Sequence, residues 1–71
     1  MNLIYPDNSY HSSVILNYGA YTMPSIAAYP NLTGWKEYYN GIATGRILEA
    51  GNSYYDVGYN SAIHYEPVYS S

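Results

Sequence analysis

The sequence predicts a small, mainly β protein with a single domain. Its 71 residues make one domain at most. Glycines at Gly41, Gly45, Gly51 and Gly58 disfavour a helix throughout the second half. Runs rich in β-branched and aromatic residues lie between turn residues, which is typical of short strands. We therefore expect a small antiparallel hairpin or meander over residues 13–66, with extended N- and C-terminal arms and at most one short helix.

The first twelve residues are expected to form an extended arm. Pro6 lacks a backbone donor and disfavours a helical conformation at Tyr5. The Asp-Asn-Ser segment from Asp7 to Ser9 has the composition of a turn. Tyr5 and Tyr10 would then be anchors for an extended segment that lies on a partner.

Residues 13–18 are the best strand of the first half, because they are β-branched or aromatic and end at Gly19. Residues 20–23 could return as the partner strand before Pro24. The composition of residues 25–29 allows either a helical turn or an extended segment.

Residues 33–39 carry conflicting signals. A threonine at the start and Asn40-Gly41 at the end favour a short helix, whereas the aromatic side chains favour a strand. We expect a short helix or a turn here.

The second half is expected to contain a hairpin. Residues 42–50 and 53–59 flank Gly51-Asn52, a residue pair suited to a type II′ turn. Pairing across this turn would set Leu48 opposite Tyr55. A type II′ turn would also require a positive φ at its first central residue, which glycine adopts without strain.

A third strand is expected at residues 62–66, where apolar and polar side chains alternate before Pro67. Residues 67–71 would then form a C-terminal tail.

The surface chemistry is unusual for a small soluble domain. The chain has twelve tyrosines, no phenylalanine and seven charged residues, with a net charge of −3. Charged residues are depleted and tyrosine is enriched at the cores of protein–protein interfaces. Since the chain has no cysteine, disulfides cannot support its small core, and association with other subunits is the expected support. We therefore expect the isolated chain to be poorly stable or to self-associate.

Several classes of partner are excluded by composition. A nucleic-acid-binding protein needs a basic stripe, which two basic residues cannot form. No apolar run is long enough for a membrane-spanning helix, and the N-terminus has no basic segment followed by an apolar one, as a secretion signal would have. We expect neither nucleic-acid nor membrane partners, and a location in a virion or, before assembly, in the host cytoplasm.

No motif indicates catalysis. Residues 41–46 lack the lysine of a phosphate-binding loop and the third glycine of a dinucleotide fingerprint, and no nucleophile elbow is present. We expect no enzyme activity, no catalytic residues and no cofactor.

Four residues make up a conceivable metal-ligand set. His64 and Glu66 would share a strand face, and His11 and Asp7 could join them. Their spacing does not demand a metal, and we expect none to bind.

The composition favours a non-enzymatic structural or interaction subunit of a multi-subunit particle. The expected setting is a minor virion protein of a phage, such as a cement, neck or tail component. A small phage-encoded inhibitor of a host enzyme is the alternative. A carbohydrate-binding module, in which Trp35 and tyrosines stack on sugars, is the third. The residues expected to contact other subunits, possibly copies of the same chain, are Tyr5, Tyr10, Trp35, Tyr38, Tyr39, Tyr65 and Tyr69.

Overall fold

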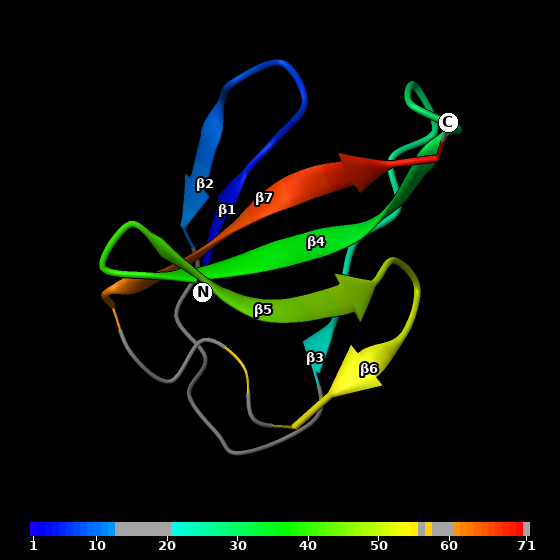
Figure 1. The fold of residues 1–71 in the computed structure, drawn as a ribbon. Coiled ribbons are helices and arrows are strands. Elements are labelled where there is room, and N and C mark those ends of the chain that lie inside the picture. The colour runs from blue at the N-terminus through cyan, green and yellow to red at the C-terminus, as the bar shows by residue number, and fades with distance from the viewer. Residues whose placement is uncertain (13–20, 56, 58–60, 71) are drawn as a thin grey trace.

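The computed structural model describes residues 1–12, 21–55, 57 and 61–70. They form a mainly β fold, which confirms the predicted class. Five strands make one sheet in the order β2-β1-β7-β4-β5, and β3 pairs with β6 in a second sheet (Figure 1). The strands are β1 Asn2–Ile4, β2 Tyr10–Ser12, β3 Tyr21–Thr22, β4 Leu32–Tyr39, β5 Ile42–Glu49, β6 Ser53–Tyr54 and β7 Ile63–Tyr69.

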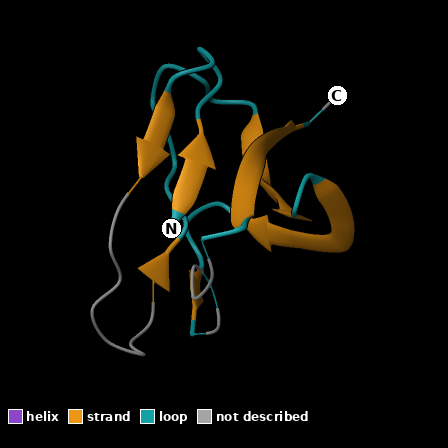
Figure 2. Cartoon of the chain, turned by 90° about the vertical axis from the view of Figure 1, so that its left-hand side faces the viewer, coloured by secondary structure: helices purple, strands orange, loops and turns teal. Residues whose placement is uncertain are grey.

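No helix occurs among these residues (Figure 2). Nothing in the described part of the chain therefore forms a helix long and apolar enough to cross a membrane.

The N-terminal residues belong to the larger sheet. β1 and β2 pair antiparallel, and the β1–β7 pair, in which Leu3 lies beside Tyr65, is parallel. The sheet is therefore mixed rather than purely antiparallel. Residues 1–12 were expected to form an extended arm, but they turn back on themselves at residues 6–8 and supply two strands of the sheet.

β7 continues through Pro67, where the sequence suggested that the strand would stop. Asn40 donates its backbone N–H to the Ala62 carbonyl, and hydrogen-bonded pairs recur at every second position of an antiparallel ladder. The hydrogen-bonded pairs of β4 and β7 therefore include Tyr38–His64 and Lys36–Glu66, whereas Pro67 lies in the non-hydrogen-bonded pair with Trp35. The nitrogen of Pro67 therefore points away from β4. On its other side β1 has already ended at Ile4, so the missing donor costs no ladder bond.

The expected short helix at residues 33–39 is wrong, because this segment is the strand β4. Asn40 and Gly41 have φ values of 50° and 80° and form the two-residue connection between β4 and β5. Asn-Gly is the preferred pair for a type I′ turn, whose twist matches that of a hairpin. The same two residues that resemble a helix end therefore close the long hairpin of this fold.

The expected pairing across Gly51-Asn52 is also wrong. Leu48 pairs with Trp35 of β4, and Tyr54 pairs with Tyr21 of β3, so β5 and β6 belong to different sheets. The turn runs from Glu49 to Asn52, whose N–H donates to the Glu49 carbonyl over 3.2 Å. Gly51 has the positive φ that was expected, at 86°, but as the third residue of that turn.

The expected strand at residues 13–18 lies outside the described residues. Within residues 20–23, Tyr21 and Thr22 do form a strand, β3, which pairs with β6. Residues 25–29 include a turn in which Tyr29 donates to the Ile26 carbonyl.

The core lies against the five-stranded sheet, and the partly buried Tyr21 and Tyr54 of the second sheet pack against it. The side chain of Trp35 is completely buried in the core, and its indole Nε1–H donates to the Pro24 carbonyl over 3.0 Å. The buried apolar side chains are Met1, Leu3, Met23, Leu32, Trp35, Leu48, Val57, Ile63 and Tyr65. Both ends of the described chain therefore contribute to the core, through Met1 and Leu3 on one side and through β7 on the other.

Candidate interaction surface

The two faces of the five-stranded sheet differ in burial because side chains alternate along each strand. The inner face carries the core residues Leu3, Trp35 and Tyr65. We call the opposite side the outer face. Strand register places on it Asn2, Ile4, Tyr10, Ser12, Gly34, Lys36, Tyr38, Ala43, Ile47, Glu49, His64, Glu66 and Val68.

A buried carboxylate occupies a bulge on the inner face. Lys36 lies opposite Ile47 but Tyr38 lies opposite Ala43. Three residues of β5, 44–46, therefore lie opposite the single residue Glu37 of β4. Gly45, at the centre of this bulge, has a φ of 89°. Glu37 itself is only 8% exposed.

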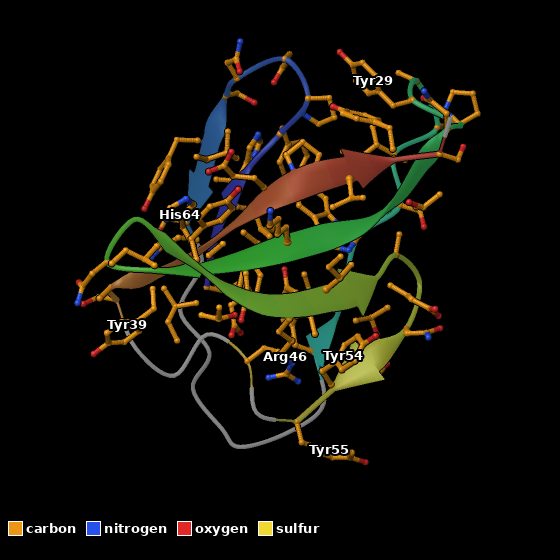
Figure 3. The ribbon with its side chains drawn as sticks, viewed as in Figure 1. Tyr29, Tyr39, Arg46, Tyr54, Tyr55 and His64 are labelled. Atoms are coloured by element: carbon orange, nitrogen blue, oxygen red, sulfur yellow. The ribbon has the colours of Figure 1, made fainter. Side chains whose placement is uncertain are left out.

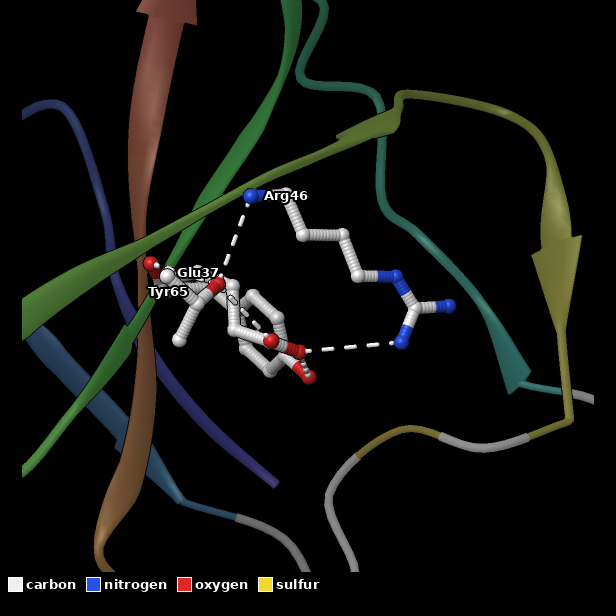
Figure 4. Close-up of polar contacts among 4 residues, drawn as sticks. Glu37, Arg46 and Tyr65 are labelled. Atoms are coloured by element: carbon white, nitrogen blue, oxygen red, sulfur yellow. Dashed lines mark hydrogen bonds and ion pairs between the residues drawn. The ribbon is translucent and has the colours of Figure 1, made fainter.

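The Glu37 carboxylate is bound by groups from three positions (Figure 4). The Thr44 hydroxyl donates to Oε1 over 3.0 Å, and the Tyr65 hydroxyl donates to Oε2 over 2.9 Å. Arg46 Nη1 lies 3.8 Å from Oε2. Because both oxygens already accept hydrogen bonds, this arrangement stabilises the bulge rather than presenting a free base. This network could not be predicted from the sequence, because residues 33–39 were expected to form a short helix or a turn.

Two of the expected interface residues are buried within the chain. Trp35 and Tyr65 have no exposed surface, so neither can reach a partner in this conformation. The expectation for them is corrected: both belong to the core. Tyr5 is half-buried, its ring stacked on His11 with centroids 3.6 Å apart and tilted against Trp35.

Three other expected residues are well exposed, namely Tyr10 at 63% and Tyr39 and Tyr69 at 43% each. Further large apolar side chains that sequence reasoning missed are also exposed, namely Ile42, Ile47 and Tyr55. Figure 3 shows Tyr39 at the tip of the β4–β5 hairpin and Tyr55 projecting away from the ribbon. The exposed side chains therefore surround the sheet instead of forming a single pocket.

Tyr38, the remaining expected residue, is half-buried on the outer face. Its ring stacks on His64 with centroids 4.9 Å apart and planes 4° apart. Lys36 Nζ lies 5.7 Å from the Tyr38 centroid, and His64 Nε2 lies 3.0 Å from a Glu66 oxygen. Trp35 is buried, so its ring offers no platform for a sugar, and His64 covers one face of Tyr38.

The four conceivable metal ligands divide between the two faces. Leu3 lies beside both His11 and Tyr65, which places His11 on the inner side of the sheet, whereas His64 and Glu66 lie on the outer side. Within the described residues, no group of three or more such side chains has the geometry to hold a metal ion.

Asp7, Ser9 and His11 form a polar cluster at the turn between β1 and β2. Ser9 donates both its hydroxyl and its backbone N–H to Asp7 Oδ1. The hydrogen bond from the Ser9 hydroxyl makes the largest contribution to holding the pKa of Asp7 below its usual value, and the bond from the Ser9 backbone N–H makes the next largest. His11 Nε2 is 2.8 Å from the Ser9 hydroxyl oxygen. Because the hydroxyl proton points to Asp7, His11 acts as the donor, and Ser9 is not arranged as an activated nucleophile.

Comparison with known proteins adds no relative: no family model, no curated protein and no solved structure matches this chain. The chain's own surface is therefore the basis for a proposed function.

Proposed function

We propose that this chain is a non-enzymatic structural or interaction subunit of a multi-subunit particle. One observation carries the proposal: large apolar side chains lie exposed around a sheet that has very few charges. They are Tyr10, Tyr39, Ile42, Ile47, Tyr55 and Tyr69. Contact with neighbouring subunits would remove these side chains from water.

The charge content supports the same proposal. Charged residues make up 10% of the chain, whereas about 25% is typical of soluble globular domains. One of the two basic residues, Arg46, is directed at the buried Glu37 carboxylate. Few charges therefore remain to oppose association.

The particle that suits this composition best is a phage virion, in which the chain would be a minor cement, neck or tail component. Small size, low charge, abundant tyrosine and the absence of cysteine support this setting. The chain would be located in the virion or, before assembly, in the host cytoplasm.

The test is quantitative mass spectrometry of particles purified from the source of the chain. The proposal expects the chain at a fixed copy number relative to the main structural protein, retained through density-gradient purification. Recovery of the chain only from the soluble fraction, free of any particle, would contradict it.

A small phage-encoded inhibitor of a host enzyme is the second candidate. The observation that favours it is the closed core, in which Trp35 and Tyr65 both have hydrogen-bonded polar groups within one chain. Such an inhibitor would be a monomer that binds one enzyme tightly. Sedimentation of the purified chain separates the candidates, because the particle subunit is expected to associate.

A further inference from the structure

We propose that the outer face of the five-stranded sheet is a two-fold interface between two copies of this chain. The inference rests on the proposed function and names one partner within the assembly. The two-fold axis would run parallel to the strands, between β7 and β4, so that β7 of one copy lies over β4 of the other.

The first row across the outer face is self-complementary about this axis. Lys36 of β4 lies beside Glu66 of β7 and beside Ile47 of β5. On the side of β7 away from β4, Ile4 of β1 lies next to Glu66, because β1 and β7 run parallel with Leu3 beside Tyr65. Rotation about the axis therefore sets Glu66 against Lys36 of the second copy, and Ile4 against Ile47.

The second row has the same property. Tyr38 lies beside both His64 and Ala43, and Asn2 of β1 lies on the far side of His64. The axis would set His64 against Tyr38 of the second copy, where aromatic rings meet, and Asn2 against the small Ala43. An isologous contact needs this type of match, in which each residue meets the counterpart of its own neighbour.

Charge also favours a second copy on this face. Two molecules with a net charge of −3 repel each other over most of their surfaces. The outer face carries Lys36, one of two basic residues in the chain, with Glu66 beside it and Glu49 near the end of β5. Its formal charge, one lysine against two glutamates, is −1, so an acidic chain is repelled less by its own copy here than its net charge of −3 implies.

The size of the face fits a modest dimer. Strands lie about 4.8 Å apart and rise about 3.3 Å per residue, so the face covers on the order of 500 Å² in projection. The exposed side chain of Ile47, at 55%, adds to this area. The total approaches the roughly 800 Å² that each partner contributes to a standard interface.

The first test uses sedimentation equilibrium of the full chain and of two lysine variants. Ile47→Lys places a charge in the interface, whereas the control Ile42→Lys places the same charge on an exposed residue of the same strand, outside the outer face. We expect the wild type and Ile42→Lys to dimerise, and Ile47→Lys to raise the dimer Kd by more than about tenfold. Circular dichroism checks that all three are folded. Equal effects of the two substitutions would overturn the proposal.

The second test exchanges the charged pair. Lys36→Glu and Glu66→Lys should each weaken the dimer, because like charges then meet across the axis. An equimolar mixture of the two variants should dimerise again, since each new charge meets its opposite in the other chain. Repulsion within one chain cannot be relieved by mixing, so this recovery identifies the intermolecular contact.

Two outcomes would overturn the inference: a mixture no more dimeric than its components, or a wild type that stays monomeric at all concentrations. A monomeric wild type that is nevertheless present at fixed copy number in purified particles would leave the proposed function intact and remove only this interface.

Discussion

Glu37 is a buried charged residue whose position depends on the donors around it. A buried carboxylate is costly unless donors compensate for its lost hydration. Here the Thr44 and Tyr65 hydroxyls bind its two oxygens, and Arg46 lies close to one of them. The bulge in β5 brings Thr44 and Arg46 to the carboxylate, so this network links the register of β5 to that of β4.

Removal of one donor tests this description. We expect Tyr65→Phe to lower the free energy of unfolding by about 2 kcal/mol, because a hydrogen bond to a buried carboxylate is lost while the ring is kept. Urea unfolding measures the change. The matched control is Tyr69→Phe, in the same strand but 43% exposed, which should change stability by less than about 0.5 kcal/mol. Similar effects of the two substitutions would show that the Glu37–Tyr65 bond is unimportant.

Asp7 gives a prediction for pH dependence. Its pKa is lowered in the folded state, first by the Ser9 hydroxyl and then by the Ser9 backbone N–H. The folded state therefore gains stability above the unfolded pKa, which is near 4 for an aspartate, and loses it as the pH falls through the folded pKa. An NMR titration should place the Asp7 midpoint below that of the same residue in Ser9→Ala. Identical midpoints would contradict the role of the hydroxyl.

At the scale of elements, the sequence was informative about class and poor about pairing. Recurrent glycine correctly disfavoured helices in the second half, as far as its described residues extend, and Gly51 correctly indicated a positive φ. Asn40-Gly41 was read as a helix end because the same residues serve helix ends and type I′ turns. Long-range pairing decided between them, since β4 is held on both sides by β5 and β7.

The candidate surface was also predicted only in part. Tyr10, Tyr39 and Tyr69 were named and are exposed, whereas Trp35 and Tyr65 are in the core. The composition shows that the chain has many aromatic rings, but strand register decides which of them point into the core and which point to the surface. A shift by one residue exchanges the two faces of a strand.

The β4–β5 turn yields a test of the hairpin. Gly41 has a φ of 80° and nothing near its Cβ position, so Gly41→Ala is strained by its backbone alone. We expect it to reduce the free energy of unfolding by about 1 kcal/mol. Asn40→Gly, in the same turn, relieves strain at a φ of 50° and should stay within about 0.5 kcal/mol of the wild type. Thermal unfolding of both variants distinguishes the two expectations, and a greater loss from Asn40→Gly would argue against this turn.

The N-terminal strands give a second test at this scale. A free arm could be deleted without loss of the fold, but Met1 and Leu3 are in the core and β1 pairs with β7. We expect deletion of residues 1–10 to abolish cooperative unfolding, because each buried aliphatic side chain contributes roughly 2–5 kcal/mol. The control Tyr10→Ala, which truncates an exposed ring in β2, should unfold cooperatively like the wild type. A cooperative transition in the deletion variant would show that the segment is dispensable.

At the scale of the whole molecule, the chain combines a closed core with a surface that has few charges. Tyrosine offers an apolar ring and a polar hydroxyl, so it tolerates water before assembly and burial afterwards. This property accounts for a chain with twelve tyrosines that places only some of them in its own core. The proposed two-fold contact would cover one face, and the exposed side chains elsewhere would contact other subunits.

The most direct measurement of the central claim is tyrosine nitration, mapped by mass spectrometry in the purified particle and in the dissociated chain. Tyr65 is an internal control, because it is buried within the chain and should react in neither state. We expect Tyr10, Tyr39 and Tyr69 to react readily in the dissociated chain and to be protected in the particle. Equal nitration of these three residues in both states would contradict the proposal that partner subunits cover this surface.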